Sequence, residues 1–129
     1  MILGIDPGTA KVGYALLEDD GEIVALGIEP LRDFEAHLVT LSERHEIETV
    51  AIGRGTNAGV LSEFAATLGV PVHLVDETET TLRARALYFA ENPPRGWRRL
   101  IPIGLQLPPR PIDDYAAVLI ARRFLHRGK

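Results

Sequence analysis

The chain has 129 residues, of which 46% are hydrophobic and 25% charged, as is typical of a globular protein, and its length predicts a single domain over 1–129. It contains no cysteine, which excludes disulfides, thiolate metal sites and a cysteine nucleophile. Neither a basic-then-apolar leader nor an apolar run approaching ~18 residues is present, so we expect a cytoplasmic protein that neither enters a membrane nor is secreted.

The formal net charge of −4 hides an asymmetry along the chain. Residues 1–80 carry four basic and 15 acidic side chains, whereas residues 81–129 carry ten basic and three acidic ones. Nine of these ten are arginines, whose planar guanidinium groups bind phosphate well. The asymmetry therefore favours a nucleic-acid partner. The alternative is a solvated basic surface that only balances the acidic part of the chain.

The chain opens with three expected strands, over residues 1–6, 11–18 and 22–28. Asp19-Asp20-Gly21 is a hairpin signal between the second and third of them, so the three should form an antiparallel meander. A helix capped by Asp33 should follow and run to about His45.

The rest of the chain alternates strands and helices. The expected elements are strands over 49–53 and 70–75, and helices from Ser62 or earlier to 68, from Thr81 to about 91 and from 113 to about 126. A Pro- and Arg-rich stretch at about 92–111 shows no regular pattern, and loops of this length are usually functional or mobile. This order predicts an α/β fold with a mixed five-stranded sheet and helices on both faces, as in the ribonuclease H-like fold.

Acidic residues stand at three strategic places in this plan. Asp6 lies inside the first apolar strand, Glu77 follows the strand 70–75, and Asp113 opens the last helix with Asp114 beside it. Mg²⁺ and Mn²⁺ prefer carboxylate oxygens. Two such ions about 4 Å apart can activate water and stabilise the leaving oxygen in phosphodiester hydrolysis. The cluster therefore predicts a divalent-metal nuclease site.

Each acid also has an ordinary structural explanation. Asp6 begins an Asp-Pro-Gly turn, in which aspartate bonds to the backbone. Glu77 could be an acid near a helix start, favoured by the helix dipole, and Asp113 could be an N-cap. The three positions together, on the right elements, favour the metal site.

Three segments of the chain resemble the ordered motifs of the YqgF/RuvX family and, more distantly, those of the RuvC Holliday junction resolvases. They are Gly4–Ala15, Val75–Thr81 and Ile112–Ala117. Residues 52–59 fall where that family has a Gly-rich loop. RuvC proteins typically carry two acids three residues apart at the last helix, but here Arg110 stands three before Asp113, which favours the YqgF branch.

The resemblance implies a ribonuclease H-like nuclease that uses Mg²⁺ or Mn²⁺. By position, Asp6, Glu77 and Asp113 would form the acidic triad, and Asp114 could serve as a fourth metal ligand. Members of the family are described as Holliday junction resolvases and as nucleases that mature the 5′ end of pre-16S rRNA. The expected partner is therefore branched DNA or precursor rRNA. A homodimer stays open, because a resolvase acting on two strands would use a two-fold axis.

Basic residues are the candidates for holding the nucleic-acid backbone. Lys11 and Arg54 are candidates for phosphate contacts near the acids, and the others are Arg83, Arg95, Arg98, Arg99 and Arg110. One alternative function is a non-catalytic nucleic-acid-binding module with the same fold. Another is an actin-like ATPase or sugar kinase, which the length disfavours because such enzymes close two domains over the nucleotide.

Overall fold

The computed structural model describes residues 1–55, 57–75, 80–92 and 113–126, including the backbone but not every side chain of the helix that begins at Thr80 and of the one that ends at His126. The elements are β1 (Ile2–Pro7), β2 (Lys11–Leu17), β3 (Ile23–Pro30), α1 (Leu31–Arg44), β4 (Thr49–Gly53), α2 (Ala58–Ala66), β5 (Val72–Val75), α3 (Thr80–Glu91) and α4 (Asp113–His126).

The five strands form one mixed sheet in the order β3-β2-β1-β4-β5. β1 pairs antiparallel with β2, and β2 antiparallel with β3, so the predicted meander is confirmed. β4 pairs parallel with β1 and with β5. The predicted α/β fold is therefore confirmed, and the first strand lies at the centre of the sheet.

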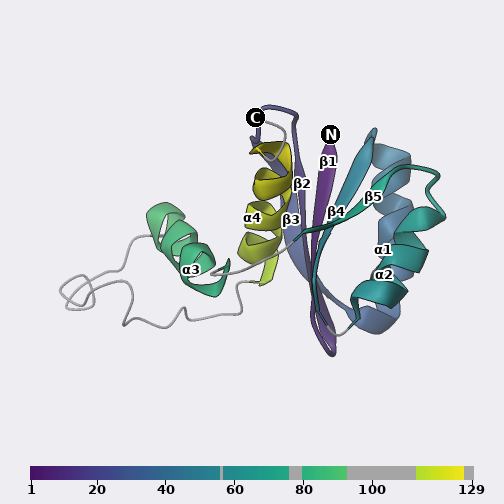
Figure 1. Ribbon diagram of the computed structural model, residues 1–129, viewed down its shortest axis with the longest axis horizontal. Coiled ribbons are helices and arrows are strands. Elements are labelled where there is room, and N and C mark those ends of the chain that lie inside the picture. Colours follow the sequence, from purple (N-terminus) through teal and green to yellow (C-terminus); the bar gives the residue numbers. More distant parts are fainter. Residues whose placement is uncertain (56, 76–79, 93–112, 127–129) are drawn as a thin grey trace.

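Helices cover both faces of this sheet (Figure 1). On one face, α1 and α2 bury Phe34, Leu38 and Leu61 against the strands. On the other face, α4 packs on the sheet through Ala117, Ala121 and neighbouring apolar residues. Aromatic residues of α3 and α4 form a third cluster, so α3 packs against α4 and lies farther from the sheet. α4 is thus buried on two sides.

Gly4 allows α4 to approach the sheet closely. A Cβ built on Gly4 would overlap the carbonyl oxygen of Ala117 and lie 2.8 Å from the Cβ of Ala121. These three small residues set the distance between β1 and α4. Since α4 begins with the predicted site residue Asp113, the contact also places the start of that helix.

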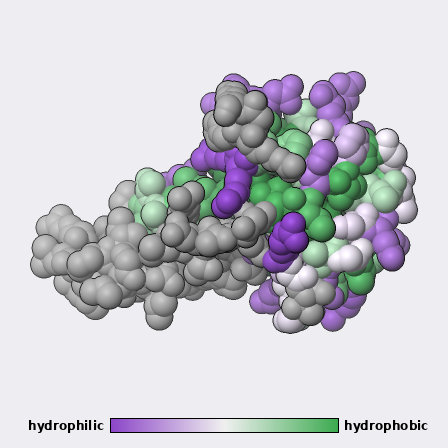
Figure 2. All heavy atoms as spheres, in the orientation of Figure 1, coloured by the Kyte–Doolittle hydropathy of each residue, from purple (hydrophilic) through white to green (hydrophobic). Residues whose placement is uncertain are grey.

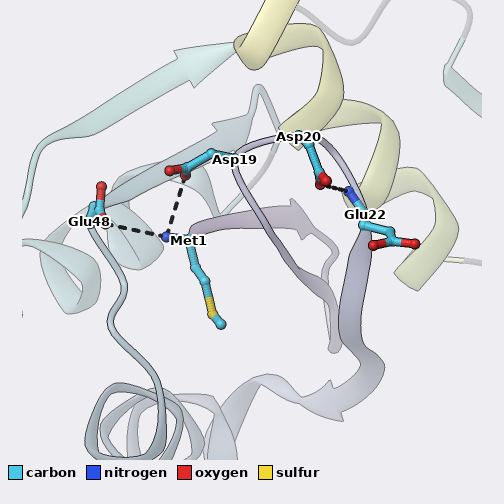
Figure 3. Close-up of polar contacts among 5 residues, drawn as sticks. All are labelled: Met1, Asp19, Asp20, Glu22 and Glu48. Atoms are coloured by element: carbon cyan, nitrogen blue, oxygen red, sulfur yellow. Dashed lines mark hydrogen bonds and ion pairs between the residues drawn. The ribbon is translucent and has the colours of Figure 1, made fainter.

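The predicted hairpin turn between β2 and β3 is confirmed (Figure 3). Gly21 has φ +93°, a conformation that favours glycine, and the backbone N–H of Glu22 donates to Asp20 Oδ1 at 2.9 Å. The amino group of Met1 lies 3.5 Å from Asp19 Oδ1 and 3.6 Å from Glu48 Oε1. Asp19 and Glu48 therefore lie near the start of β1, whereas Asp6 lies near its other end, about 17 Å away along the strand.

Several predictions about element ends were wrong. β3 ends at Pro30 and not at residue 28, and α2 ends at Ala66 and not at residue 68. Asp33 does not cap α1, because the helix begins at Leu31 after Pro30, and Asp33 lies in its first turn instead. A carboxylate there still interacts favourably with the helix dipole. β5 begins at Val72 and not at residue 70. Pro71, which has no N–H to donate, accepts a bond from the backbone N–H of Val50 just before the strand. The loop predicted at about 92–111 lies outside the described residues except for Asn92.

Hydrophobic residues are visible at the surface on the side of the sheet covered by α1 and α2, with hydrophilic residues around them (Figure 2). Among the described residues, the large apolar side chains that are exposed are Val24, Val39, Val60 and Leu74, each on a different element. Exposed apolar residues scattered in this way are normal, and we assign no partner to them. In the part of the chain that the structure describes, no helix has the length and hydrophobicity needed to cross a membrane.

Candidate active site

The candidate site lies where the three parallel strands end. Ile5 of β1 is level with Ile52 of β4, which is level with Leu74 of β5. The next row therefore contains Asp6, Gly53 and Val75. The carboxyl ends of parallel strands are where α/β sheets usually bind ligands.

The strand order sets the spacing along this row. β4 lies between β1 and β5, so two strand spacings, roughly 10 Å, separate the backbones of Asp6 and Val75. Glu77 itself lies outside the described residues.

Asp6 faces α4. Side chains alternate along a strand, and Ile2 and Gly4 both lie on the α4 face of β1, so Asp6 lies on that face as well. It is half-buried. In Figure 1, β1 and α4 run in opposite directions, so the end of β1 that carries Asp6 lies toward the start of α4.

The first turn of α4 brings Asp113 and Asp114 toward the same end of the sheet. Ala117 contacts Gly4, and Asp113 lies about one helical turn before Ala117. The structure describes the backbone of Asp113 but not its side chain. Asp114 is buried, with 2% of its surface exposed, and its Oδ1 accepts a hydrogen bond from the backbone N–H of Tyr115 at 3.0 Å. Burial of a carboxylate is costly unless its charge is compensated, which makes Asp114 a notable member of the site.

The predicted basic residues lie in different parts of the chain. Lys11 and Arg54 are both exposed; Lys11 begins β2 after the turn that follows Asp6, and Arg54 follows the end of β4. Arg83 lies on α3, and its side chain is not among those described. Arg95, Arg98, Arg99 and Arg110 lie outside the described residues. The structure therefore brings Lys11 and Arg54 to the edge of the sheet that carries Asp6.

Comparison with known proteins adds an independent line of evidence. No model of a protein family matches the sequence. A protein of Halalkalibacterium halodurans named "Putative pre-16S rRNA nuclease" is 33% identical, and the alignment covers 97% of this chain and 95% of that protein. The chain belongs to the YqgF/RuvX family of RuvC-like nucleases. A RuvC crossover junction endodeoxyribonuclease of Moorella thermoacetica is 32% identical to this YqgF/RuvX chain. That alignment covers 94% of this chain and 88% of the RuvC protein.

A solved structure shows that this YqgF/RuvX protein shares the RuvC fold. Thermus thermophilus RuvC superposes with a TM-score of 0.56 over 98% of this chain and 92% of its own, at 21% sequence identity. At this identity the likeness establishes the fold alone.

Two features of the site were not predicted from the sequence. The burial of Asp114 is one, because it depends on α4 being covered by both the sheet and α3. The other is Asn57, which donates from Nδ2 to the backbone oxygens of Gly8 and Thr9 in the turn after Asp6. No local pattern indicates this contact, because its partners lie nearly 50 residues earlier in the sequence.

The charge of Asp114 also acts on Tyr14. Burial raises the pKa of the Tyr14 hydroxyl above its ordinary value, and the negative charges of Glu29 and Asp114 raise it further. The unfolded chain therefore loses this proton at lower pH than the folded one does. The contribution of Tyr14 to stability is complete below pH of about 10, the ordinary tyrosine value, and is lost as the pH rises above it.

Tyr14→Phe should remove this alkaline loss of stability. We expect the free energy of unfolding of the wild type, relative to that of Tyr14→Phe, to be constant between pH 7 and pH 9 and to fall above pH of about 10. Urea unfolding of both proteins at matched pH values measures the difference. A difference that stays constant through pH of about 11 would contradict the raised pKa.

Proposed function

We propose that this YqgF/RuvX protein is a divalent-metal-dependent nuclease that hydrolyses phosphodiester bonds in structured nucleic acid. The observation that carries the proposal is the position of Asp6, on the α4 face of the central strand at the carboxyl ends of the parallel strands, toward the start of α4. We propose Asp6, Glu77 and Asp113 as the acidic triad, with Asp114 as a fourth carboxylate.

Glu77 is proposed in preference to Asp76 because of its position in the segment Val75–Thr81, which resembles the second motif of the family.

The described donors fit Mg²⁺ or Mn²⁺. Asp6 and Asp114 supply only oxygen atoms, and both carboxylates lie on the α4 side of the sheet. Among the side chains that the structure describes, no three acidic or histidine residues form a metal-binding group, and two of the four proposed ligands, Glu77 and Asp113, are not among these side chains. Divalent cations, when bound there, would lower the pKa of the attacking water and stabilise the leaving oxygen.

The protein side chains have complementary tasks in this proposal. The acids concentrate negative charge at the ends of the strands. Lys11 and Arg54, both exposed at that edge, would hold the phosphodiester backbone, and the arginines after residue 81 would extend the basic surface. Binding of this kind weakens steeply with salt and is only weakly sequence-specific.

The experiment that tests the proposal is a cleavage assay with three substrates: a precursor 16S rRNA fragment, a four-way DNA junction and single-stranded DNA. Each is incubated with the purified chain in Mg²⁺, in Mn²⁺ and with a chelator. We expect cleavage that requires the cation, with the rRNA fragment as the first candidate because relatives carry that name. The junction is the second candidate because of the similarity to RuvC sequences.

The same assay distinguishes the alternative. Binding of these substrates without cleavage in either metal would overturn the nuclease proposal and favour a non-catalytic binding module with the same fold. Cleavage that continues in the chelator would contradict the proposed metal dependence.

A further inference from the structure

The segment between β4 and α2 contacts the turn that follows Asp6. Asn57 Nδ2 donates to the carbonyl oxygen of Gly8 at 2.5 Å and to that of Thr9 at 3.3 Å. Both partners are carbonyl oxygens, which only accept hydrogen bonds, so the NH₂ group and not the amide oxygen must face them. The side chain therefore ties together two segments that are nearly 50 residues apart in the sequence.

Asn57 gives up its usual local role to make this contact. It occupies the N-cap position of α2, where asparagine normally accepts a hydrogen bond from the first turn of the helix, yet its side chain makes no cap bond. A missing cap lowers the stability of a helix. A residue that departs from a local rule in this way is expected to serve something outside its own helix.

The neighbours of Asn57 contact the same strand ends. A Cβ on Gly55 would lie 2.9 Å from Pro7 Cγ and 3.0 Å from the Pro7 carbonyl oxygen, so only glycine fits at this close approach. The backbone N–H of Arg54 donates to the carbonyl oxygen of Val75 at 3.3 Å. One short segment thus contacts the end of β1, which carries Asp6, and the end of β5, which precedes Glu77.

We infer that Asn57 is a positioning residue, which holds the Gly8–Thr9 turn and so keeps the Asp6 carboxylate in the arrangement that binds the divalent cation. This inference rests on the proposed function. Without the two hydrogen bonds, the turn after Asp6 gains conformational freedom, and cation binding must then restrict it. The loss of this tether should therefore weaken cation binding.

The test separates this role from helix stability by comparing Asn57→Ser with Asn57→Ala. Serine is as good an N-cap as asparagine but is too short to reach both carbonyl oxygens. Since wild-type Asn57 makes no cap bond, Asn57→Ser should at least keep the stability of α2, and it should lose the tether. Ser62→Ala is the matched control, since it removes a side-chain bond to the Ala58 carbonyl oxygen within α2 and leaves the turn untouched. The full chain is used for all four proteins.

The decisive measurement is the dissociation constant for Mn²⁺ alone, from calorimetry without nucleic acid, beside urea unfolding without metal. We expect both Asn57 variants to bind Mn²⁺ roughly 5–30-fold more weakly than the wild type, the factor that corresponds to ordering the backbone of one residue, and Ser62→Ala to bind like the wild type. Wild-type affinity in both Asn57 variants would overturn the inference and leave the nuclease proposal standing. A wild type that binds neither Mn²⁺ nor Mg²⁺ would overturn both.

Discussion

Asp6→Asn is expected to lower metal-dependent cleavage at least about 100-fold, since even the loss of an outer-shell partner of a metal ligand can reduce activity by that factor. Asparagine preserves the size of the side chain but removes the negative charge that would bind the cation. The measurement is the single-turnover cleavage rate at saturating Mn²⁺, on whichever substrate the wild type cleaves. Cleavage that survives unchanged would indicate a contaminating nuclease.

Asp6→Asn should lower cleavage but should not lower the stability of the metal-free protein. Asp6 and the buried Asp114 both lie on the α4 side of the sheet, and like charges that lie close together repel each other. Without metal, the melting temperature of Asp6→Asn should therefore equal or exceed that of the wild type, and the rise in melting temperature on adding Mn²⁺ should disappear. Glu63→Gln, an exposed change in α2, is the control and should alter neither quantity.

Gly4→Ala should produce the second large effect, on stability and activity together. The added Cβ would overlap the carbonyl oxygen of Ala117, and a backbone atom cannot move aside as the tip of a flexible side chain can. Overpacking of this kind typically destabilises by about 1–3 kcal/mol. Because α4 must shift, the carboxylates in its first turn move relative to Asp6, and cleavage should fall as well.

Two control variants isolate this displacement. Gly59→Ala places a Cβ where nothing lies within 4 Å, so it should leave cleavage near the wild-type value and, since Gly59 lies in α2, raise stability by up to about 1 kcal/mol. Leu38→Ala opens a cavity on the opposite face of the sheet and should cost about 2–5 kcal/mol. At temperatures where all variants are folded, Leu38→Ala should cleave like the wild type and Gly4→Ala should not. Equal activity of these two variants would show that the contact between β1 and α4 affects stability alone.

The fold was predictable because local patterns agreed with the final packing. Asp19-Asp20-Gly21 specified the hairpin, and helix α4 begins and ends at the predicted residues, Asp113 and His126. The start of α1 was not predictable, because aspartate is a common N-cap residue and only the backbone shows that the helix begins at Leu31, two residues before Asp33.

The site was less predictable because it depends on contacts between distant segments. The motifs identified Asp6, and the structure places it on the α4 face at the expected edge. No local pattern shows that Asn57 bonds to a turn nearly 50 residues earlier, or that α3 and the sheet together bury Asp114. The roles of Glu77 and Asp113 remain predictions.

The contact between Arg122 and the β2–β3 turn limits when the fold can be completed during synthesis. Arg122 of α4 donates from Nε and Nη2 to the Gly21 carbonyl oxygen, at 3.2 and 3.1 Å, across 101 positions of sequence. Because synthesis runs from the N-terminus, a contact across so many positions can form only after all the intervening residues have been made. A nascent chain therefore carries Asp6 long before Asp113 and Asp114 exist beside it. Translation itself delays the assembly of the proposed catalytic centre until the fold is nearly complete.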